Sequence, residues 1–128
     1  MMFNLTTKRE IDSNAPDKPG IYRIYWIKDT QSQPINRISG TDTNGLLYIG
    51  HTKGSLQTRL NQFRCSAFKK STNHSGALKY RKINILERTI MPNEIYVEIE
   101  PCSDSLKREG QELKKYADKF GEVPPLNG

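Results

Sequence analysis

Two tyrosines, an arginine and a glutamate of this sequence have side chains suited to one kind of chemistry. Tyr22 and Tyr48 each lie in an apolar run beside a glycine. Arg59 lies in a helical pattern, and Glu109 lies in the last helical pattern, ahead of a terminal asparagine. Transfer of a phosphoryl group needs an activated oxygen nucleophile, a cation at the charge that develops on phosphorus, and a metal ion near the leaving oxygen. Tyrosine, arginine and a carboxylate with Mg²⁺ can fill these roles, so the set indicates phosphodiester chemistry.

Three segments carry the pattern of β-strands. The first, GIYRIYWI at 20–27, is β-branched and aromatic, the second is LLYIG at 46–50, and the third, EIYVEIE at 94–100, alternates apolar with polar residues. The segment 28–45 between the first two is polar and rich in turn residues, so these strands are expected to be antiparallel neighbours. The first fifteen or so residues carry no clear period.

Helical patterns follow the second and third strands. Ser55 is a candidate N-cap for the first helix, a shorter helix is expected at 75–83, and the last helix should begin at Ser103 or Ser105 and end at Gly121. The apolar residues of the first and last helices are expected to face the sheet: Leu56, Leu60, Phe63 and Ala67, and Leu106, Leu113, Tyr116 and Phe120.

The order of these motifs resembles that of the GIY-YIG nuclease family. GIY at 20–22 and YIG at 48–50 are the two signature tripeptides, and GSLQTRL with Arg59, NHSG with His74, Glu109 and the closing PPLN follow in the family's order. The resemblance spans about Pro19 to Asn127. Either tripeptide alone is a weak signal, but five landmarks in the right order are a strong joint signal.

The resemblance implies an α/β domain of the α+β type, with a small three-stranded antiparallel sheet flanked by helices. One domain is expected over 1–128, with its core at about 19–127. The implied activity is that of an endonuclease that cuts DNA by in-line attack of water with one divalent metal ion, Mg²⁺, or Mn²⁺ as a substitute.

The family pattern also implies roles for individual residues. Tyr22 would accept the proton of the attacking water with Tyr48 beside it, and Arg59 would stabilise the phosphate. A free tyrosine titrates near 10, so Tyr22 can act as a base only if nearby cations, such as Lys53, Arg59 or the metal ion, favour its phenolate, or if a relay takes the proton.

One departure from the family pattern concerns proton transfer. Many relatives carry a histidine or tyrosine where this chain has Phe63, so no acid–base group stands there. His74 is then the candidate substitute for a phosphate contact or a proton relay. The alternative is that His74 is a local cap or a surface residue.

The last helix offers two glutamates for the metal ion. Glu109 is expected on the sheet-facing side and Glu112 on the polar side, so Glu109 is the predicted ligand. Gly110 beside it would leave room for the metal or substrate, while Glu112 remains an alternative because its distance to Asn127 suits some relatives better. Asn127 matches the asparagine that closes the family pattern, where it would steady the site by hydrogen bonds, or it is disordered at the terminus.

Basic residues are concentrated between 51 and 88, where nine stand against one acid, in a chain of net charge +6 and pI near 9.4. Such a block matches a phosphate backbone, although a solvated helical face is the alternative. The predicted nucleic-acid contacts are Lys53, Lys69, Lys70, Lys79, Arg81 and Lys82.

Composition narrows the class of protein. The chain has 34% hydrophobic and 27% charged residues, and its mean hydropathy is -0.74, which is typical of a polar protein with a single core. No apolar run approaches a membrane span and the start lacks the apolar core of a secretory signal, so a cytoplasmic location is expected. Cys65 and Cys102 have no Cys or His at ligand spacing and are expected to be reduced.

Two other functions compete with the endonuclease. One is a catalytically silent DNA-binding or interaction module of the same fold, and the other is a regulatory or structural subunit whose basic block binds an acidic protein patch. No helix-turn-helix, zinc finger or basic zipper accompanies the core, so specificity is low, structural, or supplied by a homodimer or a partner protein. The 28–45 loop is longer than the family's compact form and either contacts DNA or is a tolerated insertion.

Overall fold

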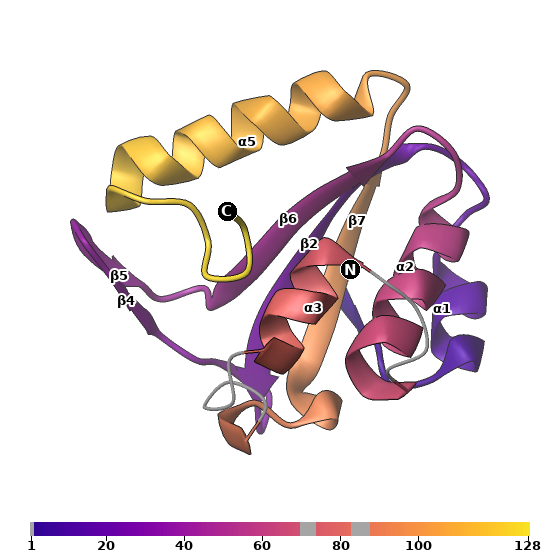
Figure 1. The fold of residues 1–128 in the computed structure, drawn as a ribbon, viewed down its shortest axis with the longest axis horizontal. Helices are drawn as coiled ribbons and strands as arrows, with labels where there is room; N and C mark the ends of the chain where they lie inside the picture. The colour runs from indigo at the N-terminus through magenta and orange to yellow at the C-terminus, as the bar shows by residue number, and fades with distance from the viewer. Residues whose placement is uncertain (1, 70–73, 83–87) are drawn as a thin grey trace.

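The computed structural model describes residues 2–69, 74–82 and 88–128 (Figure 1). Its elements in chain order are β1 (Met2–Asn4), α1 (Lys8–Asn14), β2 (Gly20–Lys28), β3 (Gln31–Ser32), β4 (Ile35–Arg37), β5 (Gly40–Asp42), β6 (Leu46–Thr52), α2 (Leu56–Arg64), a π-helical turn (Cys65–Lys69), α3 (Ser75–Lys82), a 3₁₀ turn (Pro92–Glu94), β7 (Ile95–Pro101) and α5 (Ser105–Phe120). No helix in these described ranges is long and apolar enough to cross a membrane.

The main sheet is built around β2, which pairs antiparallel with β6 along one edge and with β7 along the other. These are the strands that the sequence predicts, and their antiparallel pairing with helices around them confirms the α+β fold class. Two short strands extend the sheet, β1 beside β7 and β3 beside the end of β2. Strands β4 and β5 form a separate hairpin.

The two faces of the sheet bury two different clusters. Successive side chains of a strand point to opposite faces, so Tyr22 and Ile24 enter the larger core under α1, α2 and α3. Arg23 and Tyr25 face α5, where Tyr116 and other residues form the smaller cluster. Figure 1 shows α5 on one side of the strands and the other helices across from it. Tyr22 lies on one face and α5, which carries Glu109, lies on the other, so the predicted site residues come from both faces of the sheet.

The first residues of the chain are ordered structure that the sequence pattern did not predict. They form β1 and the short helix α1, which Thr7 caps by accepting a hydrogen bond from the Glu10 N–H. Leu5 and Ile11 are fully buried in the larger core. A helix of two turns with one buried residue is too short to show a period, which explains the missed signal.

The buried face of helix α5 differs from the expected one in its first turn. Leu113, Tyr116 and Phe120 pack in the smaller cluster as expected, but Leu106 is 53% exposed, so its predicted position on this face is wrong. Leu106 lies about 80° around the helix from Tyr116, at the margin of the buried stripe. The N-cap is Asp104, and not Ser103 or Ser105, whereas Gly121 ends the helix in the left-handed conformation as expected.

We predict opposite stability effects for two Gly→Ala substitutions at α5. Gly110→Ala should raise the free energy of unfolding by about 0.5–1 kcal/mol, because an added Cβ meets no described atom within 4 Å and the backbone loses freedom in the unfolded chain. Gly121→Ala should lower it by about 1 kcal/mol or more, because Gly121 has φ +79 and its Cβ would lie 2.6 Å from Ser39 Oγ. Urea unfolding measures both, and a loss of stability in Gly110→Ala would contradict this reading of the helix.

Candidate active site

The two signature tripeptides are brought together by the pairing of β2 with β6. Tyr22 pairs with Gly50 and Ile24 pairs with Tyr48, so both tyrosines point to the same face of the sheet. Their ring centroids are 6.0 Å apart. Both rings are buried in the larger core, with Tyr22 fully inaccessible. The structure therefore places the two tyrosines in one cluster, as the sequence predicts.

Glycines allow these rings to lie directly against the backbone. A Cβ at Gly50 would stand 2.4 Å from Tyr22 Cζ and 2.5 Å from its hydroxyl oxygen. A Cβ at Gly76 would stand 2.7 Å from Tyr48 Cε1. Such separations are far below van der Waals contact, so any other residue would displace a tyrosine ring.

His74 joins this cluster from the start of α3. Its ring is fully buried, and its Nε2 lies 2.7 Å from the Tyr22 hydroxyl oxygen. Its Nδ1 accepts hydrogen bonds from the backbone N–H groups of Gly76 and Ala77, at 3.1 and 3.4 Å. His74 thus caps the first turn of α3 and also contacts the candidate base, and because it is fully buried it is not a surface residue.

These hydrogen bonds determine the tautomer of His74. A backbone N–H can only donate, so Nδ1 must carry the lone pair and Nε2 must carry the proton of a neutral ring. The Nε2–H group therefore donates to the oxygen of Tyr22. Burial lowers the pKa of His74 to about 3, and the positive charge of Arg59 acts in the same direction, so the ring stays neutral at physiological pH.

The same burial acts against ionisation of Tyr22. Desolvation raises the pKa of Tyr22 far above the ordinary tyrosine value, and the neighbouring Tyr48 raises it further. Arg59 opposes these effects because its guanidinium favours the phenolate. The charge of Arg59 thus reaches both Tyr22 and His74 from α2.

Helix α2 presents Arg59 and Phe63 to the site one turn apart. Ser55 caps this helix as predicted, accepting a hydrogen bond from the Thr58 N–H. Arg59 is half-buried, and its Nη1 donates to Gln62 Oε1 at 2.9 Å. Phe63 is fully buried, with its ring centroid 5.0 Å from that of His74. Phe63 thus forms an apolar wall against His74.

Glu109 approaches β6 from the α5 side. Its Oε2 lies 2.8 Å from Nδ1 of His51, the residue that follows the YIG tripeptide. In the sequence His51 stands at the start of the basic segment and is not among the predicted site residues, although its place directly after the tripeptide is a usable signal. Glu109 also lines a pocket of about 310 Å³ with Tyr48, Lys79 and Asn127. Glu109 is thus brought next to Tyr48 from the opposite face of the sheet.

Glu112 is not on the polar side of α5, so that expectation is wrong. Its Oε1 accepts hydrogen bonds from Arg23 Nη2 at 2.7 Å and from Arg108 Nη2 at 2.9 Å. Its side chain is only 18% exposed. Glu100 of β7 binds the same two arginines. Glu112 is therefore committed to ion pairs, whereas Glu109 faces the pocket.

Asn127 lies on the outer edge of β6. Its Oδ1 accepts from the backbone N–H of Ile49 and its Nδ2 donates to the Ile49 carbonyl, both at 2.9 Å. Lys79 Nζ donates to the Asn127 carbonyl at 2.9 Å. The tail folds back between α5 and β6 (Figure 1), and Asn127 occupies backbone groups beside Tyr48 that a neighbouring strand would otherwise pair.

The 28–45 loop contacts the segment that leads into this tail. Arg37 Nη2 donates to the Val123 carbonyl at 2.6 Å and forms an ion pair with Glu122 at 2.9 Å. The Ser39 N–H donates to the Phe120 carbonyl at 2.9 Å. The loop therefore holds the end of α5 and the start of the tail. This contact is separate from the two expected alternatives, a DNA contact and a tolerated insertion.

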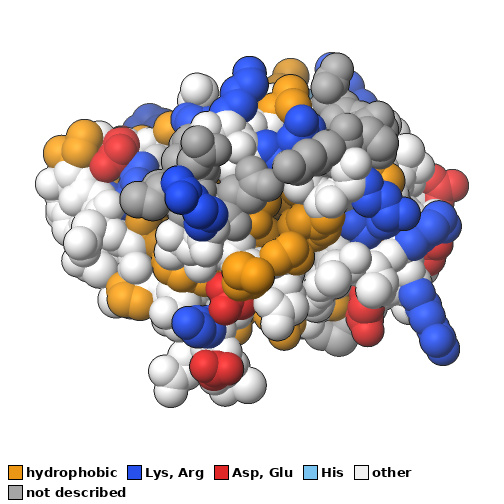
Figure 2. Space-filling view, turned by 60° about the horizontal axis from the view of Figure 1, so that its bottom comes forward, with side chains coloured by type: hydrophobic (Ala, Val, Ile, Leu, Met, Phe, Trp, Pro, Cys, Tyr) orange, Lys and Arg blue, Asp and Glu red, His pale blue; other side chains and the backbone are white. Residues whose placement is uncertain are grey.

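The predicted nucleic-acid contacts differ in their surroundings. Lys53, Lys69 and Lys82 are exposed. Lys79 and Arg81 are half-buried and bind backbone carbonyls, Arg81 that of Ser66 at 3.0 Å. Lys70 lies outside the described residues. On the face in Figure 2, basic side chains are spread among acidic and uncharged ones.

The donor set fits a single hard cation. Among the described residues, no three His, Cys, Asp or Glu side chains are grouped closely enough to hold a metal ion. Mg²⁺ keeps several waters and needs only one or two carboxylates together with substrate phosphate oxygens. Glu109, at the wall of a pocket open to solvent, suits that requirement.

A comparison with known protein families identifies the fold family of this chain. The family model of the GIY-YIG catalytic domain matches residues 18–121. Neither the curated proteins nor the solved structures contain a significant match.

We predict that His74 is the neutral Nε2–H tautomer. Nitrogen-15 NMR should show a protonated Nε2 and a bare Nδ1, unchanged down to about pH 5, because the pKa of His74 is about 3 and well below the ordinary 6.5. Since the folded-state pKa is depressed, the stability that the neutral ring contributes is present above about 6.5 and is lost as the pH falls toward 3. Titration near 6.5, or a proton on Nδ1, would contradict the hydrogen-bond assignment.

Proposed function

The chain belongs to the GIY-YIG family of catalytic domains, and we propose that it is an endonuclease that hydrolyses DNA phosphodiester bonds with Mg²⁺. The observation that carries the proposal is the hydrogen-bonded pair of Tyr22 and His74, with Tyr48 and Arg59 beside it. A pocket lined by Tyr48 and Glu109 adjoins this cluster. A base, a cation and a carboxylate thus meet around β6.

Tyr22 is the proposed acceptor of the water proton. For that role its phenolate must be stabilised, since burial alone disfavours it. The His74 Nε2–H group is aimed at the Tyr22 oxygen, and this hydrogen bond strengthens when the oxygen becomes an anion. Because Nδ1 of His74 is held by backbone N–H groups, His74 acts as a fixed donor and not as a second base.

Arg59 is the proposed cation at the phosphate. Its guanidinium is a planar fork that matches phosphate oxygens, and its charge also favours the Tyr22 phenolate. Stabilisation of charge in a transition state by one such donor contributes about 3 kcal/mol. Arg59 therefore serves both the nucleophile and the phosphate.

Glu109 is the proposed ligand of Mg²⁺, or of Mn²⁺ in its place. The bound ion would supply charge neutralisation at the leaving oxygen. His51 holds one carboxylate oxygen of Glu109 in place, and Asn127 holds the Ile49 backbone beside Tyr48. Both are proposed to position the site.

DNA is the proposed partner, bound mainly through its phosphates. Lys53, Lys69 and Lys82 are available to the solvent, and Lys79 lines the Glu109 pocket. Lys70 and Arg81 remain proposed contacts from the sequence. A homodimer or a partner protein as the source of specificity, and a cytoplasmic location, are proposals of the same kind.

One observation favours a second candidate, a catalytically silent DNA-binding module of the same fold. Tyr22 is fully buried and its pKa is raised. Without a suitable cation beside it, Tyr22 would stay protonated and could not act as a base. DNA binding without cleavage would support this candidate.

We predict that the wild-type protein nicks supercoiled DNA with Mg²⁺ and not with excess EDTA, and that Glu109→Gln abolishes this activity while DNA binding persists. Removal of the carboxylate charge removes the only proposed ligand. Glu112→Gln is the matched control on the same helix: it should lower the unfolding temperature, because Arg23 and Arg108 lose a partner, but leave cleavage near the wild-type rate. If Glu112→Gln loses cleavage and Glu109→Gln does not, then Glu112, and not Glu109, is the ligand of the metal ion.

We also predict that Tyr22→Phe lowers the cleavage rate by about a hundredfold or more, because the proton acceptor is removed while the ring remains packed on Gly50. Single-turnover cleavage measures the rate, and circular dichroism checks that the fold is retained. Near wild-type cleavage by Tyr22→Phe would make Tyr22 a core aromatic and leave Tyr48 as the candidate base.

A further inference from the structure

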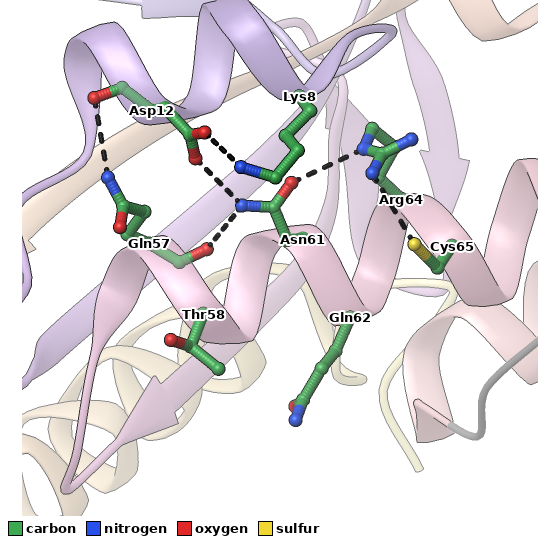
Figure 3. Close-up of a pocket in the computed structure, with 8 residues that line it drawn as sticks. All are labelled: Lys8, Asp12, Gln57, Thr58, Asn61, Gln62, Arg64 and Cys65. Atoms are coloured by element: carbon green, nitrogen blue, oxygen red, sulfur yellow. Dashed lines mark hydrogen bonds and ion pairs between the residues drawn. The ribbon is translucent and has the colours of Figure 1, made fainter.

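Another groove, lined by polar and charged residues, lies on the outer side of α2, away from the Glu109 pocket. It has a volume of about 370 Å³ and is formed between α1 and α2 (Figure 3). Lys8 and Asp12 line it from α1, and Asn61 and Arg64 line it from α2. Neither the proposed catalytic residues nor the predicted DNA contacts include any of these four.

Arg64 is the unusual residue of this groove. It is 7% exposed, yet within the described ranges no ion pair joins it to a carboxylate. Its Nε donates to Asn61 Oδ1 at 3.3 Å and its Nη2 donates to Cys65 Sγ at 3.4 Å, both long contacts with neutral groups. The charge of Arg64 acts on Asp12 and helps to lower the pKa of that carboxyl, but no described carboxylate is hydrogen-bonded to the guanidinium. A largely buried cation whose hydrogen bonds go only to neutral groups is electrostatically unfavourable. An anion in the groove would remove that penalty.

The single carboxylate of the groove is already engaged. Asp12 forms an ion pair with Lys8 and accepts from Asn61 Nδ2 at 3.0 Å, and these two contacts lower its pKa. The two cations Lys8 and Arg64 and the one carboxylate Asp12 give the groove a net charge of +1. The Lys8 side chain is 67% exposed, so its ammonium can reach an incoming anion. The groove therefore combines a fixed guanidinium with a movable ammonium.

The groove adjoins the candidate active site through one side chain. Gln62 lines the groove and accepts a hydrogen bond from Arg59 Nη1 at 2.9 Å. Arg59 and Arg64 are five residues apart on α2, which is about 7.5 Å along the helix axis and about 140° around it. A phosphate in the groove would therefore lie on the flank of α2 next to Arg59, and not at Arg59 itself.

We propose that this groove binds a backbone phosphate of the DNA substrate, at a position flanking the cleaved bond. The proposal rests on DNA being the substrate, as proposed above. Arg64 would be the buried cation, and Lys8 would be the exposed cation that closes on the phosphate. Thr58 and Gln62, which project away from the Asp12 network in Figure 3, would border the path toward Arg59.

The test measures binding to duplexes that each carry one neutral methylphosphonate at a known position, in EDTA so that no strand is cut. Wild-type protein should lose affinity when one flanking phosphate is neutralised. Lys8→Gln should bind the unmodified duplex about fivefold more weakly, as expected for one exposed charge pair, with a salt slope smaller by about 1. It should also be insensitive to the methylphosphonate at that flanking position.

Lys114→Gln is the matched control, because Lys114 is exposed and pairs with Asp118 four residues later on α5, as Lys8 pairs with Asp12 on α1. It should bind like wild type. Arg64→Gln, checked for folding by its unfolding temperature, should repeat the insensitivity of Lys8→Gln.

Two results would overturn the proposal for the groove alone. One is that Lys8→Gln binds every duplex as Lys114→Gln does. The other is that Arg64→Gln has a lowered unfolding temperature while no single methylphosphonate position weakens binding of the wild-type protein. Wild-type protein that binds no duplex would overturn both this proposal and DNA as the substrate. Wild-type protein that binds and responds to the flanking methylphosphonate, but does not cut with Mg²⁺, would support the groove and refute the endonuclease.

Discussion

The contact between the Tyr22 ring and the backbone of Gly50 is the constraint on which the candidate site depends. No side chain fits at position 50, because its Cβ would overlap both Cζ and the hydroxyl oxygen of Tyr22. With the ring held flat against β6, the Tyr22 oxygen lies within hydrogen-bond distance of His74. His74 is in turn fixed by α3, whose first N–H groups bind its Nδ1 and whose Gly76 lies against Tyr48. Strand pairing, helix capping and ring packing therefore converge on one oxygen atom.

The opposite face of the sheet positions Glu109 by electrostatic contacts. Arg23 of β2 and Arg108 of α5 share the carboxylates of Glu100 and Glu112, which ties α5 to both β2 and β7. Glu112 lies three residues after Glu109 on α5, so the network and the contact between Glu109 and His51 share one face of the sheet.

The edge of β6 is the place where the two faces meet. A free strand edge offers unpaired backbone groups that invite association with another chain. Asn127 and Leu126 occupy such groups on Ile49 and Leu47. The 28–45 loop holds the segment before them through Arg37. A long insertion and a short tail, far apart in the sequence, therefore act together as support for one wall of the Glu109 pocket.

The sequence by itself determined the strands β2, β6 and β7, the cap of α2 at Ser55, the end of α5 at Gly121, and the family to which these motifs belong. Those features depend on local periodicity and on residue types at fixed spacing, which the chain carries without reference to its neighbours. Only the tertiary structure decided that His74 donates to Tyr22, 52 residues away, and that Glu112 pairs with Arg23, 89 residues away. It also decided that Leu106 is exposed and that the 28–45 loop supports the tail. Periodicity tells which side of an element is apolar, but it does not tell which charged or polar group of another element will meet that side.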